Sequence, residues 1–349
     1  VMVGVDPQTR RSIARNGGWR VCFAGMEFWN RGLVKKLIMF DFSEKNAFPL
    51  LRNLLDADSS RLFHEQHEIK QAHPADILTD KLLYLNVKFQ TFWKNSSLET
   101  QWDNSKNNPK GDSISDYILE LDSFYDSLFF IIKCFEPPRE QDNKDAIRWL
   151  KGIKSVRNQK FLDSTSQSQK LFRDMANKLK HGHVSISMLT ISNHKNIPVD
   201  GFYIQSIVGP NDQRGPDPDI HQLYRGAATA ISYNHFALHS IGCLFLHLHK
   251  LNETLFPKNS SNFFKQSEAA SKMIFACESI DHDFYPDEYE KPFMGIKRVN
   301  PDKFSLIYPY RYKKSANEIF HKISGYKAEV RFNPRTSSSN GIIPYMPLL

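Results

Sequence analysis

The sequence has few cysteines and no long apolar run. The cysteines lie far apart and form no CxxC pair; they are Cys22, Cys134, Cys243 and Cys277. Such usage excludes a zinc ribbon and a dense disulfide framework. The most apolar long stretch, 231–248, is interrupted by histidines, so the chain has no run of about 18 apolar residues. We therefore expect no transmembrane helix and no membrane partner.

Signatures of targeting and of cofactor binding are also missing. The first twenty residues contain several arginines but no apolar segment of the kind found in secretory signals. No P-loop lysine motif and no serine elbow occurs. The stretch "HEQHE" at 64–68 has Glu68 where a zinc protease needs its second histidine. These absences predict a cytoplasmic protein with no cofactor and no metal.

The composition is that of a folded protein with a basic surface. Hydrophobic residues make up 40% of the chain and 26 residues are Phe, which is enough for a large core. The length of 349 residues favours more than one unit. The formal net charge of +8 suits an anionic partner such as nucleic acid.

Hydrophobic periodicity predicts a mainly α fold, with a helical bundle, an inserted β-hairpin and appended N-terminal and C-terminal segments. Apolar residues recur at helical spacing before the hairpin, which alternation places at about 184–208. One long helix then follows over 219–255 and is ended by Pro257. The predicted units are an N-terminal region with short strands and then helices (1–95), a turn-rich linker (96–113), the bundle (113–256) and a C-terminal helix with an aromatic, basic tail (257–349).

The last helix before the hairpin, "SQSQKLFRDMANKLKHG" (166–182), follows predicted helices at 113–138 and 142–164 and has the clearest functional pattern. Its apolar residues fall within an arc of about 140°, and Arg173, Asn177 and His181 share the opposite face. Gly182 ends the helix, so His181 lies in the last turn, where a cation is favoured. The polar row is either the solvated end of a basic helix or one wall of a cleft that binds a phosphodiester.

The bundle together with "RDMANKLKHG" resembles the HEPN superfamily (higher eukaryotes and prokaryotes nucleotide-binding). Members of this family are small helical bundles, many dimerise, and active ones cleave RNA with an arginine, a polar neighbour and a histidine four to six residues further on. The resemblance implies that Arg173 and Asp174 form the arginine–polar pair and that His181 is the histidine. Seven residues separate Arg173 from His181, one more than in the family pattern.

This resemblance predicts a homodimeric protein that binds RNA and cleaves it without a metal at the dimer cleft, in a defence or toxin system. Arg173, Asn177, Asp174 and His181 are then the catalytic residues. Arginine would hold phosphate oxygens and histidine would move a proton. The neighbouring Lys178, Lys180 and His183 would contact RNA. A protein partner such as an antitoxin is a further expectation.

Two other functions stay open at this point. One is a non-catalytic helical interaction protein on the same scaffold. The other is a metal-dependent enzyme that uses the histidines and the cysteine spaced every four residues along the long helix, although such residues are more often satisfied histidines of a core. The aromatic, basic tail either binds single-stranded nucleic acid or packs its rings on the bundle, and we favour packing.

Overall fold

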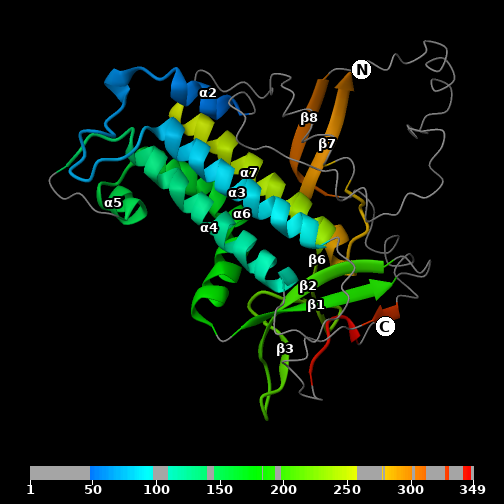
Figure 1. The fold of residues 1–349 in the computed structure, drawn as a ribbon. Coiled ribbons are helices and arrows are strands. Elements are labelled where there is room, and N and C mark those ends of the chain that lie inside the picture. The colour runs from blue at the N-terminus through cyan, green and yellow to red at the C-terminus, as the bar shows by residue number, and fades with distance from the viewer. Residues whose placement is uncertain are drawn as a thin grey trace, which may run out of the picture.

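The computed structural model is mainly helical, with small antiparallel sheets (Figure 1), which confirms the predicted fold class at that level. It describes residues 48–96, 109–139, 145–182, 184–192, 198–257, 277, 280–300, 303–311, 327–329 and 341–346. Its α-helices are α2 (Pro49–Leu55), α3 (Pro74–Ser96), α4 (Pro109–Lys133), α5 (Ala146–Gly152), α6 (Val156–His181) and α7 (Tyr233–Leu255). None of the described helices is both long and apolar enough to cross a bilayer.

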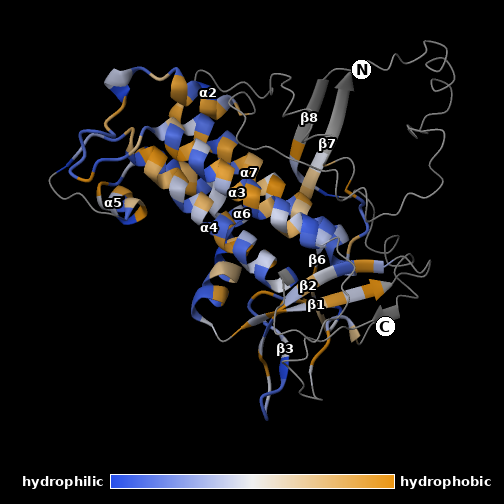
Figure 2. Cartoon of the chain, viewed as in Figure 1, coloured by the Kyte–Doolittle hydropathy of each residue, from blue (hydrophilic) through white to orange (hydrophobic). Residues whose placement is uncertain are grey.

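The long helices α3, α4, α6 and α7 build the bundle. Helices α3, α4 and α6 are amphipathic, whereas α7 is buried on nearly all sides, and Figure 2 shows apolar and polar residues on the helices of the bundle. Phe92 of α3 stacks on Tyr117 of α4, with ring centroids 5.2 Å apart, and meets Phe236 of α7 edge-on. These aromatic contacts join three helices at the centre of the core.

The core begins earlier in the chain than the sequence suggested. Buried residues from Phe48 onward belong to the same cluster as those of α4, α6 and α7. The bundle therefore includes α2 and α3 and does not start at residue 113. The predicted linker connects two helices that pack against each other, because α3 and α4 bury their apolar faces together; its residues 97–108 lie outside the described part of the chain.

The boundaries of two predicted helices are corrected. The helix expected at 166–182 begins at Val156, because Ser155 accepts a hydrogen bond from the backbone N–H of Asn158 and caps the helix there. Just before it, Lys154 adopts a positive φ of 53°, which ends the short helix α5. The helix expected from residue 219 begins only at Tyr233, where Ser232 caps it through the N–H of His235.

The residues between those two positions form strands. Strand β1 (Ser185–Ser192) pairs with β2 (Pro198–Ile207) in an antiparallel hairpin with Met188 opposite Phe202, which confirms the predicted hairpin. The strands β3 (Arg214–Pro216), β6 (Ile231–Ser232) and β9 (Lys327–Glu329) extend the pair into a five-stranded sheet. The strands β4 (Leu223–Tyr224) and β5 (Ala227–Ala228) make a separate small ribbon. Arg225 and Gly226 adopt positive φ values of 52° and 85° and form the turn between β4 and β5, which a continuous helix cannot contain.

Part of the C-terminal tail packs on the bundle, as we favoured. After the 3₁₀ helix η4 (Pro286–Glu290), β7 (Phe293–Asn300) and β8 (Lys303–Tyr310) form a second hairpin, which extends beyond α7 in Figure 1. Tyr308 lies against Gly242 of α7 and hydrogen-bonds the thiol of Cys243, with Oη and Sγ 3.0 Å apart. The expected N-terminal strands lie outside the described residues, as does most of the expected C-terminal helix that follows residue 257.

Candidate functional site

The C-terminal half of α6 has the two faces that the sequence predicted. Phe172, Met175 and Ala176 are buried against the bundle. Asn177 and His181 on the other side are exposed. Gly182 follows directly, and its N–H donates to the carbonyl of Lys178 over 2.7 Å, so His181 is the last helical residue. The polar row therefore lies along one side of α6, and the residues around it determine which chemistry it can carry out.

Arg173 faces two carboxylates of α4. Its Nε lies 2.9 Å from Oδ1 of Asp122, and its Nη1 donates to Oδ2 of Asp126 over 3.3 Å. The other amino group of the guanidinium, Nη2, also contacts Asp126 closely. Burial lowers the pKa of Arg173, but its bonds to Asp126 and the charge of Asp122 outweigh this and raise the pKa above its ordinary value. This side chain therefore joins α6 to α4 in addition to the apolar face of the helix.

Asp122 is the centre of this contact. Its side chain has no exposed surface, although it sits on a helix whose neighbouring positions are apolar. Besides Arg173, Lys180 reaches its Oδ2 over 3.0 Å and the amide of Gln169 lies 3.5 Å from its Oδ1. A buried carboxylate is stable only when cations and hydrogen-bond donors surround it. The two cations of α6 therefore compensate a charge inside the bundle.

The other charged residues assigned to the site are paired as well. Asp174 pairs with Lys170 one turn earlier on α6. Lys178 lies 2.7 Å from Oδ2 of Asp219 and 3.2 Å from Oδ2 of Asp217, both in the segment after β3. The hydrogen bond with Asp219 raises the pKa of Lys178. Lys178 and Lys180, which we expected to contact RNA, are thus held by carboxylates of the same chain.

Asn177 and His181 are the two members of the row that stay open to solvent. Within the described residues, neither side chain makes a hydrogen bond or an ion pair. His183 lies outside the described residues. The structure therefore brings Arg173, Lys180 and two aspartates together, and it leaves the amide and the imidazole of the row on the surface.

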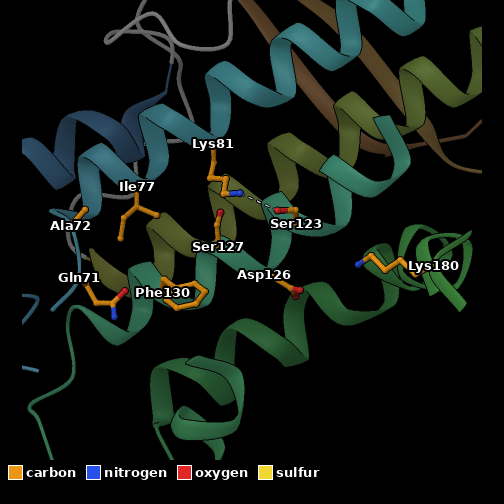
Figure 3. Close-up of a pocket in the computed structure, with 9 residues that line it drawn as sticks. All are labelled: Gln71, Ala72, Ile77, Lys81, Ser123, Asp126, Ser127, Phe130 and Lys180. Atoms are coloured by element: carbon orange, nitrogen blue, oxygen red, sulfur yellow. Dashed lines mark hydrogen bonds between the residues drawn. The ribbon is translucent and has the colours of Figure 1, made fainter. Parts of the chain in front are cut away.

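A cleft of about 440 Å³ adjoins this network between α3, α4 and the end of α6 (Figure 3). Lys81 of α3 donates to Oγ of Ser123 over 3.0 Å. Lys180 approaches from α6, and Asp126, the partner of Arg173, lines the cleft between them. The apolar part of the wall comes from Ala72, Ile77 and Phe130. The charged residues that line the cleft are thus two lysines and one aspartate.

Sequence reasoning missed Asp122, Asp126 and Lys81. The available signal was the pair of aspartates four residues apart in "ILELDSFYDSLFF", where a strongly apolar helix contains charges that must find partners. The identity of the cations that pair with these aspartates depends on how α4 and α6 pack against each other. That packing cannot be inferred from a single sequence.

Three histidines of α7, His235, His239 and His247, lie in the core. Nε2 of His247 is 2.9 Å from Oγ of Ser168, and burial lowers the pKa of His247 to about 3. Nδ1 of His239 is 2.9 Å from the carbonyl oxygen of Pro292, and its pKa is lowered to about 4 by burial. Burial raises the pKa of Cys243 to about 12. Among the described residues, no three histidine, cysteine or carboxylate side chains are placed to hold one metal ion.

Charge is distributed unevenly along the chain. Residues 291–335 contain eleven Lys and Arg but three Asp and Glu, a formal charge of +8. Residues 48–290, which include the bundle and the row, contain 27 Lys and Arg against 31 Asp and Glu, a formal charge of −4. Residues 1–47 contain eight Lys and Arg against four Asp and Glu, a formal charge of +4. The largest excess of positive charge therefore lies in residues 291–335, and the helices around α6 have no such excess.

Comparison with known proteins adds no relative: no family model, no curated protein and no solved structure matches this chain. The resemblance to HEPN proteins therefore depends on the residues of α6 and on the helical bundle.

Proposed function

We propose that the protein is an RNA-binding protein on a HEPN-like helical scaffold, and that residues 291–335 supply its main contact with RNA. The observation that carries the proposal is the charge distribution, +8 in this segment against −4 in residues 48–290. Lys and Arg provide most of the affinity for nucleic acid by neutralising phosphates. The cations of α6 are poorly suited to this role because Asp122, Asp126, Asp217 and Asp219 already neutralise them.

The hairpin β7–β8 presents the first part of this segment. Its backbone runs from the surface of α7 away from the bundle (Figure 1), and the register places Arg298 opposite Phe304 and Asn300 opposite Lys303. Basic residues at 297, 298 and 303 therefore belong to one short ribbon. A two-stranded ribbon of this kind can follow a nucleic-acid backbone.

Binding of a fluorescein-labelled single-stranded RNA, followed by anisotropy at several salt concentrations, tests this proposal. Lys297→Glu with Arg298→Glu should weaken binding at least tenfold and make the plot of log affinity against log salt less steep, because about 0.7 counterions are released per phosphate contact on a single strand. The matched control is Arg148→Glu with Lys151→Glu, which changes the charge equally on the exposed face of α5. Equal losses in both double variants would contradict the proposal.

RNA cleavage is a second candidate function, favoured by the exposure of His181 and Asn177 side by side on α6. In this case His181→Ala should abolish cleavage without weakening RNA binding. An incubation of labelled RNA with wild-type protein in the presence of EDTA measures it. If the wild type binds RNA but does not cleave it, this second function is refuted and only the proposed RNA binding is retained.

A further inference from the structure

The stretch that contains α5 and the start of α6 has cations but no acids. Residues 146–162 contain five Lys and Arg and no Asp or Glu, a formal charge of +5. This local charge contrasts with the formal charge of −4 for residues 48–290 as a whole. The stretch is therefore a basic island on an otherwise acidic bundle, and it is separate in sequence from residues 291–335.

Three of these cations are unpaired. Arg148, Lys151 and Lys154 are exposed, and within the described residues their side chains make no ion pair and no hydrogen bond. Arg148 and Lys151 are three positions apart on α5, so they lie on the same side of the helix, where like charges repel. The N–H of Lys154 donates to the carbonyl of Lys151 over 3.0 Å, in the tight turn that leads to α6. Unlike Lys178 and Lys180, these three cations have no carboxylate of the described chain as a partner.

The other two cations of the stretch are engaged within the chain. Nη1 of Arg157 lies 3.1 Å from Oε1 of Glu136. Nζ of Lys160 lies 3.5 Å from the carbonyl oxygen of Glu253. The attraction of this surface for an anion therefore comes mainly from the three unpaired cations.

An exposed aliphatic side chain lies next to the unpaired cations. Val156 is the first residue of α6 and is 81% exposed. The aromatic rings of the same stretch are buried, since Trp149 is 4% exposed and Phe161 is fully buried. Surfaces that bind single-stranded nucleic acid stack bases on exposed aromatic rings, whereas protein contacts combine apolar residues with charges around them. The residues exposed here therefore suit a protein segment better than a nucleic acid.

We propose that Arg148, Lys151, Lys154 and Val156, which we call the α5 patch, bind an acidic segment of a partner protein. Carboxylates of the partner would pair with the three cations, and an apolar residue between those carboxylates would cover Val156. Complementary charge of this kind speeds association and discriminates against wrong partners. Binding also relieves the repulsion among the three cations, which no carboxylate of the described chain offsets.

The α5 patch lies apart from the proposed RNA contact. Figure 1 shows α5 toward one end of the bundle and the hairpin β7–β8 toward the other. The inference therefore goes beyond the proposed RNA binding, and the two surfaces can be occupied at the same time. Arg148→Glu with Lys151→Glu, which should leave RNA binding unchanged, should remove the acidic partner.

Anisotropy of a fluorescein-labelled acidic peptide, titrated with the full chain, tests the proposal. The probe has about twelve residues, all glutamate or aspartate except one central leucine, and at roughly 3.3 Å per residue it is long enough to cross the patch. The wild type should bind it with a dissociation constant on the order of 10 µM. Arg148→Glu with Lys151→Glu should weaken binding at least tenfold, because two attractive pairs become repulsive. The matched control, Lys297→Glu with Arg298→Glu, makes the same change of charge on the hairpin and should stay within about twofold of the wild type.

Three results of this titration would overturn the proposal. The first is no binding by the wild type at about 100 µM protein, well above the expected dissociation constant. The second is an equal loss of peptide binding in the two double variants. The third is a loss of single-stranded RNA binding in the α5 variant as large as its loss of peptide binding, which would assign the α5 patch to nucleic acid.

The apolar contact is tested separately with two peptides. Val156→Ser should weaken binding of the leucine peptide roughly threefold and should not change binding of the same peptide with serine in place of leucine. Leu223→Ser is the control, because Leu223 is 72% exposed and belongs to β4. It should change neither affinity. An equal effect of Val156→Ser on both peptides would contradict the contact between Val156 and the apolar residue of the partner.

Discussion

The carboxylate of Asp122 lies fully buried on α4, and side chains of α6 surround it. At the scale of single residues, this arrangement changes the meaning of Arg173. An arginine at the end of a helix with a nearby histidine is a pattern of RNA-cleaving sites in the HEPN family. Here the guanidinium forms an ion pair with a carboxylate that is buried inside the bundle. We therefore expect its replacement to affect the stability of the fold first.

Replacing Arg173 should therefore destabilise the fold. Arg173→Met removes one of the two cations beside Asp122 and should lower the free energy of unfolding by about 2–4 kcal/mol, measured by urea denaturation. Asp122→Asn in the same chain should recover part of that loss, because the amide carries no charge that needs compensation. Lys170→Met, a surface change on the same helix, should alter the free energy by no more than about 0.5 kcal/mol. Equal effects of Arg173→Met and Lys170→Met would contradict this role.

Buried histidines should make the protein sensitive to acid. Burial depresses the pKa of His247 to about 3 from 6.5, so its stabilising contribution is complete above about pH 6.5 and is lost as the pH falls toward the folded value. The loss is about 1.4 kcal/mol per pH unit for one such histidine. His247→Gln should reduce the slope of unfolding free energy against pH, between pH 6 and 5, by about that amount. His181→Gln, on the exposed end of α6, is the control, and identical slopes for the two variants would refute the prediction.

At the scale of elements, the hairpin β7–β8 depends on a glycine of α7. A β-carbon at position 242 would lie 2.2 Å from the ring of Tyr308, far inside contact distance. This close approach also places the Tyr308 hydroxyl 3.1 Å from Nδ1 of His239 and 3.0 Å from the thiol of Cys243. The glycine, the tyrosine and the two polar groups together fix the hairpin on the helix.

Gly242→Ala should therefore displace the hairpin. The steric conflict should cost about 1–3 kcal/mol, partly offset by the better helix propensity of alanine. Hydrogen exchange of the backbone amides at 293–310 should become faster, while that of α4 stays the same. Gly152→Ala is the matched control, since a β-carbon there meets nothing within 4 Å. Unchanged exchange in the hairpin would mean that the contact with Gly242 does not anchor it.

The elements that sequence could predict are those with a strong local pattern. The hairpin at 185–207 follows from alternating residues around a turn, and the apolar face of α6 follows from its spacing. The start of α7 could not be predicted in this way, because the turn between β4 and β5 contains one glycine, Gly226, and a single glycine is tolerated within a helical pattern. The break before α6 depends on the cap at Ser155 and on a single positive φ at Lys154.

The candidate site was predicted only in part for a related reason. Helical periodicity correctly placed Arg173, Asn177 and His181 on one face of α6. It could not tell which of them meets another helix, because Asp122 and Asp126 lie about fifty positions earlier and reach Arg173 only through packing. Ion pairs between residues far apart in the chain produce no periodic pattern in the sequence.

At the scale of the whole molecule, most of the core and much of the positive charge lie in different parts of the chain. The core is built mainly from residues 48–256, with a few residues added between Cys277 and Met294. Residues 48–290 have a formal charge of −4, whereas residues 291–335 have a charge of +8 and residues 1–47 a charge of +4. We therefore expect an anionic partner to be attracted to the segment 291–335 more strongly than to the helices of the bundle.

Arg173 links α6 to Asp122 and Asp126 of α4 and so stabilises the fold, and we propose that the basic C-terminal segment binds RNA. The most direct test is the RNA affinity of the folded double variant Asp122→Asn with Arg173→Met, measured at a temperature at which circular dichroism matches the wild type. The account predicts an affinity within about twofold of the wild type, because no phosphate contact has been removed. A tenfold or greater loss of RNA affinity in this folded variant would contradict the account. It would indicate that Arg173 belongs to the RNA-binding site.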